Sequence, residues 1–303
     1  TSEYKTEAYY LSAQASYRLR QYQQTIENLE QYQQQPNSIQ SNNRKAAIYL
    51  KAYALFSQKK YADADPIYRE YINTIGRDSN NRTYPDALNR LGDCLFHERK
   101  FQEASEIYAQ VAQLKSIGAD YALMQNGYAQ GLMHNYMNKV DILTSLTQEY
   151  PYSDYADDAL YEIARAELQQ EHHLDAINAY QLLLNNYPNS KLTAKASLEQ
   201  GLTYRTLRQY DKAVEIFKTT VSTYTGSEEA YSALEGLEQI YVETNNVDEY
   251  IAYVKSLDNM DIQAQSREDS LVYITAELQY MMGNHQQAID GFTNYLTNYC
   301  PGG

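Results

Sequence analysis

The stretch of this chain whose residue types best suit chemistry is EHHLD, which contains Glu171, His172, His173 and Asp175. Imidazole and carboxylate groups bind zinc and also act as acids and bases. Adjacent histidines on a helix point in different directions, so His172 and His173 do not form the same-face pair that a helical zinc site needs. The stretch also falls in a short polar segment between two apolar patterns. We therefore interpret it as a solvated turn and predict no metal site.

Other patterns typical of catalysis or cofactor binding do not occur in the sequence. His97, His134 and His285 stand singly, and there is no glycine-rich phosphate loop, no GxSxG and no CxxC. Acidic residues are frequent, but no pair is set apart as an acid and a base. The sequence therefore predicts a protein without enzyme activity and without a cofactor.

The charge of the chain argues against two classes of partner. Its 39 acidic and 25 basic residues give a formal net charge of −14, and such a field repels nucleic-acid phosphates and anionic lipid headgroups. Hydrophobic residues make up 43% of the chain, which is unlike a disordered composition. No apolar segment approaches the roughly 20 residues that span a bilayer. We expect a folded chain with no nucleic-acid partner and no membrane span.

The two cysteines and the first residue bear on the context of the chain. Cys94 and Cys300 would lie several repeats apart in a stacked array, so we predict a buried small residue and a terminal residue, not a disulfide. The chain begins at Thr1 without a methionine. We expect it to be a fragment of a longer protein from which a signal, an anchor or further repeats are missing.

A recurring motif indicates which elements position these residues. The stretches QEYPYSD and NNYPNSK align Tyr150 with Tyr187 and Ser153 with Ser190, 37 residues apart. A small residue inside a helical pattern recurs at nearly the same period, at Ala13, Ala52, Gly92, Gly127, Ala164, Gly201 and Ala276. A period of this length is typical of a repeat array and not of a single globular core.

Each repeat reads as two helices joined by a short turn. Twelve residues after most small positions stands an alanine, and four residues further on stands a large apolar residue, such as Tyr180 or Phe217. The apolar spacing is helical on both sides of a polar junction. We predict that Tyr180 and Phe217 are core, that Pro188 ends a second helix, and that Ser190 caps the next first helix.

The stretch GLTYRTLRQYDKAVEIFKTTVSTY resembles the tetratricopeptide repeat family through the spacing of Gly201, Tyr204, Ala213 and Phe217. The period near 37, with YPxS between units, looks like the subgroup found in bacterial envelope proteins, including outer-membrane assembly lipoproteins and a periplasmic partner of the Tol-Pal system. The resemblance implies an all-α, right-handed superhelical solenoid of about eight helical hairpins. We expect one solenoid over 1–303, with units at roughly 1–40, 41–80, 81–118, 119–153, 154–190, 191–227, 228–265 and 266–303.

The resemblance also implies a binding surface, because the family sets its first helices side by side along a concave groove. Positions next to the small residues would give that groove an aromatic stripe with interspersed arginines. The candidate partner-binding residues are Tyr17, Tyr53, Phe56, Arg90, Phe96, Tyr128, Arg165 and Arg205. We expect Tyr53, Phe56, Phe96 and Tyr128 to be substantially exposed. A second aromatic set, three residues before the small positions, is better explained by packing between first helices: Tyr10, Tyr49, Tyr161 and Tyr273.

The function that these observations favour is a non-enzymatic scaffold that binds a partner protein or peptide in its groove. The resemblance points to assembly in the bacterial cell envelope or periplasm, with the cytoplasm as the alternative compartment. Two other functions stay open. Tyrosines and acids on a helical scaffold also suit a carbohydrate-binding or glycan-processing protein, and a cytoplasmic peptide-sensing regulator is a third interpretation.

Overall fold

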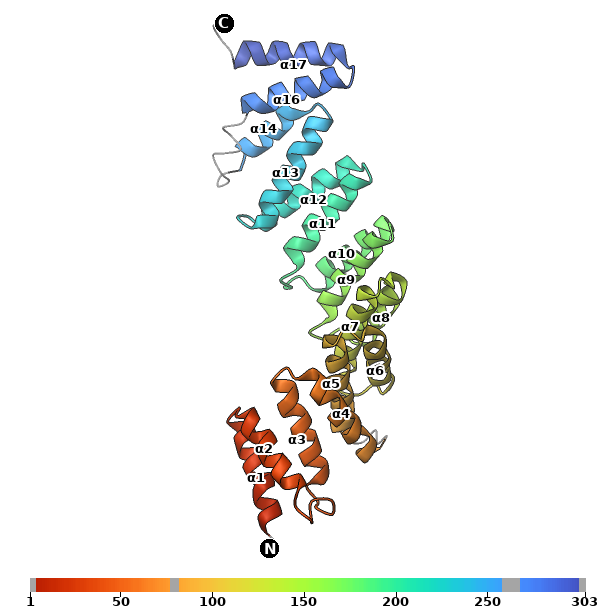
Figure 1. The fold of residues 1–303 in the computed structure, drawn as a ribbon. Helices are drawn as coiled ribbons and strands as arrows, with labels where there is room; N and C mark the ends of the chain where they lie inside the picture. Colours follow the sequence, from red (N-terminus) through yellow and green to blue (C-terminus); the bar gives the residue numbers. More distant parts are fainter. Residues whose placement is uncertain (1–3, 77–81, 258–267, 300–303) are drawn as a thin grey trace. The chain divides into compact units, whose positions relative to one another are not determined.

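The chain is helical throughout its described part. The computed structural model describes residues 4–76, 82–257 and 268–299, and these ranges contain sixteen α-helices and no strand (Figure 1). The chain divides into two compact units, Thr1–Ala166 and Glu167–Gly303. The predicted all-α class is confirmed.

The helices alternate with short connections in both units. The first unit contains α1 (Tyr4–Arg18), α2 (Tyr22–Gln33), α3 (Arg44–Ser57), α4 (Tyr61–Ile75), α5 (Thr83–His97), α6 (Phe101–Gln113), α7 (Ala119–Leu132), α8 (Tyr136–Glu149) and most of α9 (Ala156–Gln169). The second contains α10 (His173–Asn186), α11 (Thr193–Thr206), α12 (Tyr210–Thr223), α13 (Glu228–Glu243), α14 (Val247–Lys255), α16 (Glu268–Met281) and α17 (His285–Asn298).

The helices of each unit stack as successive hairpins. In the first unit α1 packs on α2, α3 on α4, α5 on α6 and α7 on α8, and each hairpin contacts the next. The first helices also meet one another directly, α1 with α3, α3 with α5 and α5 with α7. The second unit repeats this scheme in α11 with α12 and α16 with α17. Each unit is therefore a helical solenoid, as predicted. A single solenoid over the whole chain, its handedness and the limits of its repeats stay predictions.

Every hairpin turn contains one residue with a left-handed backbone, and these residues are Arg20, Lys59, Arg99, His134, Glu171, Arg208, Asn245 and Gly283. The backbone N–H of the following residue donates to the carbonyl five residues before it, with N···O distances of 2.8–3.0 Å. This bond ends the first helix and reverses the chain. The left-handed residues recur every 35 to 40 positions, so the sequence period is also a period of backbone conformation.

The small residues of the first helices make room for the large residues of the second helices. A Cβ atom on Gly92, Gly127 or Gly201 would lie 2.5 Å from the large side chain sixteen positions later. Phe217 also meets the first helix of the next hairpin, where a Cβ on Gly236 would lie 2.7 Å from its ring. Phe217 and Tyr180 have no exposed surface. The prediction that both are core is confirmed.

The connections between hairpins follow the predicted pattern only in part. Helix α10 ends two residues before Pro188, as predicted. The prediction that Ser190 caps the next helix is wrong, because α11 begins only at Thr193 and the Ser190 hydroxyl accepts the backbone N–H of Leu192 at 3.0 Å. The corresponding Ser227 does cap its helix, since α13 begins directly after it and its hydroxyl accepts a first-turn N–H at 3.1 Å.

Two further predictions concern the cysteines and the membrane. Cys94 is a free thiol without exposed surface, as predicted, and burial raises its pKa to about 12. Cys300 lies outside the described residues. Among the helices that the structure describes, none has both the length and the apolar character needed to cross a membrane.

Candidate functional site

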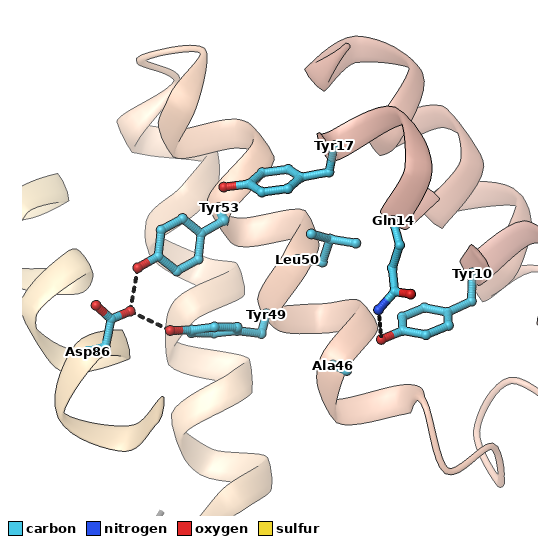
Figure 2. Close-up of a pocket in the computed structure, with 8 residues that line it drawn as sticks. All are labelled: Tyr10, Gln14, Tyr17, Ala46, Tyr49, Leu50, Tyr53 and Asp86. Atoms are coloured by element: carbon cyan, nitrogen blue, oxygen red, sulfur yellow. Dashed lines mark hydrogen bonds between the residues drawn. The ribbon is translucent and has the colours of Figure 1, made fainter. Parts of the chain in front are cut away.

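The first unit contains a pocket of about 510 Å³ built from its first helices (Figure 2). Helix α1 and helix α3 face each other across it, and the start of α5 closes one end. Four tyrosines, two small apolar residues, an amide and a carboxylate line it: Tyr10, Tyr17, Tyr49, Tyr53, Ala46, Leu50, Gln14 and Asp86. Tyr17 and Tyr53 were predicted to bind a partner, and the structure places both in this pocket.

Hydrogen bonds hold the aromatic walls of the pocket in place. Asp86 accepts a hydrogen bond from the hydroxyl of Tyr49 and another from Tyr53, the latter at 2.5 Å. The rings of Tyr49 and Tyr53 meet edge to face with their centroids 5.0 Å apart. Burial and the bond to Asp86 raise the pKa of both phenols, so they remain neutral donors. On the opposite wall the Gln14 amide donates to the Tyr10 hydroxyl at 2.7 Å.

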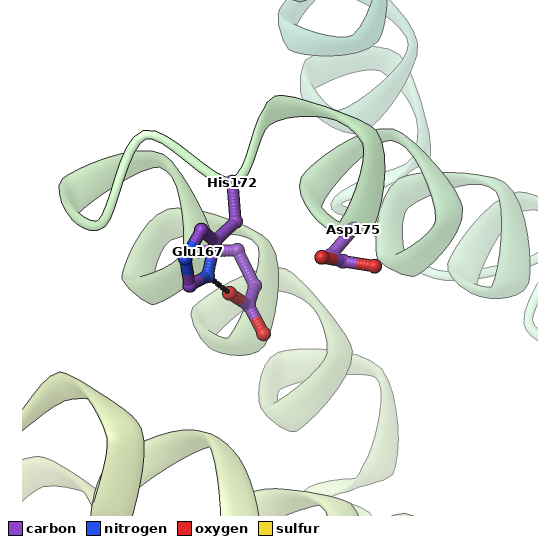
Figure 3. Close-up of side chains that lie close together, drawn as sticks. All are labelled: Glu167, His172 and Asp175. Atoms are coloured by element: carbon purple, nitrogen blue, oxygen red, sulfur yellow. Dashed lines mark hydrogen bonds and ion pairs between the residues drawn. The ribbon is translucent and has the colours of Figure 1, made fainter.

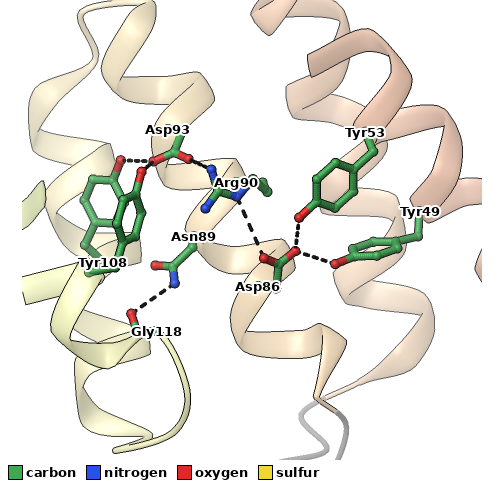
Figure 4. Close-up of polar contacts among 9 residues, drawn as sticks. Tyr49, Tyr53, Asp86, Asn89, Arg90, Asp93, Tyr108 and Gly118 are labelled. Atoms are coloured by element: carbon green, nitrogen blue, oxygen red, sulfur yellow. Dashed lines mark hydrogen bonds and ion pairs between the residues drawn. The ribbon is translucent and has the colours of Figure 1, made fainter. Parts of the chain in front are cut away.

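A charged network supports this pocket from α5 (Figure 4). Arg90 pairs with Asp93 at 2.5 Å and lies 3.9 Å from the Oδ1 atom of Asp86. The other carboxylate oxygen of Asp93 accepts hydrogen bonds from Tyr108 and Tyr121, each at 2.7 Å. Arg90 was predicted to contact a partner. The structure places its guanidinium over the rings of Phe56 on α3 and Tyr121 on α7, 5.5 Å and 5.2 Å from their centroids.

The expectation that the aromatic candidates are substantially exposed is wrong. Tyr53, Phe56, Phe96 and Tyr128 are all half-buried, as is Tyr17. For Tyr17, Phe56 and Phe96 the cause is a contact across the hairpin turn, where the aromatic residue near the end of a first helix meets an aromatic residue that begins the second helix. The ring pairs are Tyr17 with Tyr22 at 5.6 Å, Phe56 with Tyr61 at 5.4 Å, and Phe96 with Phe101 at 5.3 Å.

Two of the predicted partner-binding residues, Tyr128 and Arg165, are influenced by the carboxylate of Glu162 on α9. Arg165 is exposed and pairs with Glu162 at 3.0 Å, and Glu162 also pairs with the buried Lys139. Burial and the charges of Glu162 and Asp158 raise the pKa of Tyr128 to about 12. Tyr128 and Arg165 therefore lie in one acidic neighbourhood of the first unit.

The second unit has a pocket of different chemistry. It has a volume of about 430 Å³ and is lined by Leu202, Arg205, Thr206, Arg208, Tyr210 and Glu243. The Tyr210 hydroxyl donates to Glu243 at 2.9 Å, and this bond raises the pKa of the phenol. Arg205 was among the predicted partner-binding residues. The structure places it beside a second arginine, Arg208.

The pocket residues that the sequence analysis missed include Gln14, Asp86, Arg208 and Glu243. Arg208 occupies the left-handed turn position that recurs once per hairpin, but the residue type at that position varies from hairpin to hairpin. Asp86 contacts side chains of the preceding hairpin, 33 and 37 residues away. No local pattern signals such a contact.

The EHHLD stretch covers the end of the turn between α9 and α10 and the first residues of α10, which begins at His173. Glu171 and His172 are exposed, in agreement with the predicted solvated turn. His172 does have acidic neighbours, because its Nδ1 atom lies 2.9 Å from Glu167, and ligand atoms of Glu167, His172 and Asp175 lie within 4.8 Å of one another (Figure 3). This group includes Glu167, which lies outside the EHHLD stretch, and it does not include Glu171 or His173. A hydrogen bond between Glu167 and His172 already uses two of its three ligand atoms.

The sequence pattern that defines the tetratricopeptide repeat matches residues 161–228 and again residues 269–299. The chain therefore contains tetratricopeptide repeats in these two segments. The tetratricopeptide repeat protein 30 homolog of Drosophila pseudoobscura pseudoobscura is 34% identical over 89 residues, which are 29% of this chain and 12% of that protein's length. A solved tetratricopeptide repeat protein from Parabacteroides merdae has the same fold, with a TM-score of 0.50 and 15% identity over 84% of this chain and 92% of that one.

Proposed function

We propose that this protein is a non-enzymatic scaffold that binds a segment of a partner protein along the first helices of its first unit. The tetratricopeptide repeats support a protein-interaction scaffold in general. The observation that carries the more specific proposal is the pocket between α1, α3 and α5, whose aromatic walls are held by hydrogen bonds to Asp86 and Gln14.

Rigid aromatic walls suit protein recognition for an energetic reason. Tyrosine offers a large contact area with few rotatable bonds, so little side-chain entropy is lost on binding. Binding hot spots are enriched in such residues when they lie in well-packed pockets. Half-burial strengthens this argument, because the rings of Tyr17 and Tyr53 are already fixed in the free protein and still present a face to the pocket.

The setting that we propose is the bacterial cell envelope. It rests on the period near 37 residues and the YPxS motif between units, which resemble envelope members of the family. Fractionation of cells that express the full-length protein, followed by detection in periplasmic, membrane and cytoplasmic extracts, tests this setting. Recovery in the cytoplasmic extract alone would contradict it.

The binding proposal is tested with peptides selected from a displayed random library on the whole chain. We expect the Tyr17→Leu and Tyr53→Leu variants to bind the selected peptides at least about tenfold more weakly, which corresponds to the loss of roughly 1.4 kcal/mol at a hot spot. Leucine keeps apolar bulk, so unfolding free energies measured in parallel should change little for Tyr17→Leu. Tyr152→Leu is the matched control, because Tyr152 is 98% exposed. Unchanged affinities in stable variants would move the interface away from this pocket.

A further inference from the structure

We infer that the pocket between α1, α3 and α5 receives a lysine or arginine side chain of the bound partner segment. This inference rests on the proposed function and names the chemistry that the pocket selects. A cation is attracted to the faces of aromatic rings and to a nearby carboxylate. The pocket contains four tyrosines, and two of them, Tyr49 and Tyr53, donate to Asp86, which is the charged side chain among its lining residues (Figure 2).

The carboxylate of Asp86 is accessible to a ligand. Its side chain is 38% exposed, although its Oδ2 atom accepts both tyrosine hydroxyls. The Oδ1 atom has Arg90 at 3.9 Å, but Arg90 makes its short ion pair, at 2.5 Å, with Asp93. Two carboxylates thus share one guanidinium, and the group of Asp86, Arg90 and Asp93 carries a net charge of −1. That uncompensated charge faces the pocket.

The electrostatic environment of the tyrosines agrees with a negative pocket on both walls. After burial, Asp86 is the main influence that raises the pKa of Tyr49 and Tyr53. On the opposite wall the charge of Glu7 acts in the same direction on Tyr10. A phenol that donates to a carboxylate also has a more electron-rich ring, because hydrogen-bonded groups polarise one another. The rings of Tyr49 and Tyr53 are therefore strengthened as partners for a cation.

A basic side chain fits this site better than an apolar or acidic one. An apolar anchor would bury Asp86 without compensating its charge, which is unfavourable. An acidic side chain would be repelled by the same carboxylate. Lysine and arginine carry an apolar stem that can lie along Leu50 and Tyr17 while the charged head reaches the rings and Asp86.

The test uses peptides selected from a displayed library on the whole chain and then resynthesised with each lysine replaced by norleucine and each arginine by citrulline. These replacements keep the length of the side chain and remove its charge. We expect replacement of one basic residue to weaken binding at least about tenfold, the size of a desolvated cation–π and carboxylate contact. In Asp86→Asn the same replacement should weaken binding much less, because the charge on the pocket is gone. Asp141→Asn, which removes an exposed carboxylate from α8 of the same unit, should behave like the unmodified protein.

Competition with tetramethylammonium provides a second measurement that does not depend on the Asp86 variant. We expect this ion to displace the peptides from the unmodified protein more effectively than sodium at equal ionic strength, and to lose that advantage in Tyr17→Leu. Both results support the inference.

The outcomes separate the inference from the function on which it rests. Peptides that depend on Tyr17 and Tyr53 but tolerate neutral replacement of every basic residue would overturn the inference and leave the proposed function intact. Peptides that bind equally well to Tyr17→Leu and Tyr53→Leu would overturn both.

Discussion

One hairpin of the first compact unit and one of the second build the same contact around different central side chains. In the first unit Tyr108 fills the space beside Gly92, and its hydroxyl donates to Asp93 at 2.7 Å. In the second unit Phe217 fills the space beside Gly201, and no hydroxyl is present. The glycine and the ring keep the same spacing in sequence. The packing thus depends on the pairing of a small with a large residue, while the polarity around the ring is free to differ.

The pockets differ in the same way. The position four residues after the small residue is Tyr17 in the pocket of the first unit and Arg205 in the pocket of the second. One pocket is acidic and aromatic, and the other contains two arginines. A repeat that conserves its packing positions can therefore offer unlike chemistry at the neighbouring positions, which suits recognition of unlike segments.

The largest effect on stability is expected when the Phe217 ring of the second unit is removed. Phe217→Ala should lower the unfolding free energy by about 3–5 kcal/mol, because it opens a cavity between α11, α12 and α13. Urea denaturation measures this loss. Ile289→Ala, at a residue that is 58% exposed, is the control and should change little. A loss below about 1 kcal/mol would show that Phe217 does not have the central role assigned to it.

The next largest effect tests the small partner of the pair. Gly201→Ala places a methyl group 2.5 Å from the Phe217 ring and should cost about 1–3 kcal/mol through overpacking. Combining it with Phe217→Leu should recover part of that cost, because the two sites share one space. A double-mutant cycle measures this coupling. Additive losses would mean that Gly201 is required for another reason.

A smaller effect on stability tests whether the Tyr108 hydroxyl distinguishes this contact from the one around Phe217. Tyr108→Phe should cost about 1 kcal/mol, because Asp93 loses one of its hydrogen bonds. Tyr68 is the matched control, since it is equally buried and its hydroxyl has no hydrogen-bond partner among the described residues. Tyr68→Phe should be neutral or stabilising. Equal losses from the two variants would show that the polar network of α5 contributes nothing to stability.

The fold could be predicted from the sequence more fully than the pocket. The hairpin fold was predictable, because the spacing of Gly201, Ala213 and Phe217 recurs and each spacing is set by helical geometry. The pocket was predictable only in its aromatic residues. Asp86 reaches tyrosines of the preceding hairpin, and the half-burial of Tyr17 comes from a ring across its own turn. Both contacts depend on tertiary packing, which no single repeat encodes.

A still smaller effect on stability concerns an acidic side chain in the first turn of a helix, compared between α9 and α12. Burial, and then the charges of Asp157 and Glu162, raise the pKa of Asp158 in the first turn of α9. The folded protein therefore binds the proton of Asp158 more tightly than the unfolded chain does. Protonation of Asp158 stabilises the fold at pH values below the unfolded pKa of about 3.9, and this stabilisation is lost as the pH rises through the folded pKa. Asp158→Asn should raise the unfolding free energy at pH 7 by no more than about 0.5 kcal/mol, since Asp158 is only partly buried and solvent screens its charge.

The pH dependence of that gain is the decisive measurement. The advantage of Asp158→Asn should disappear at about pH 2.5, where Asp158 is protonated in both the folded and the unfolded state. Asp211→Asn removes an exposed acid from the first turn of α12 in the second unit and controls for the loss of a favourable dipole contact. A destabilised Asp158→Asn protein at pH 7 would mean that the dipole contact outweighs burial.

The smallest effect is expected at the polar turn of the second unit, where we predict that chelators leave the melting temperature unchanged. Glu167, His172 and Asp175 offer three ligand atoms, whereas a structural zinc site takes four, and Glu167 and His172 already bind each other at 2.9 Å. His172 and Asp175 are exposed, so water competes for any ion. Thermal unfolding with EDTA and with added zinc ions measures the effect. A melting temperature that falls with EDTA in the unmodified protein, but not in His172→Ala, would establish a metal site here and add a third kind of chemistry to the second unit.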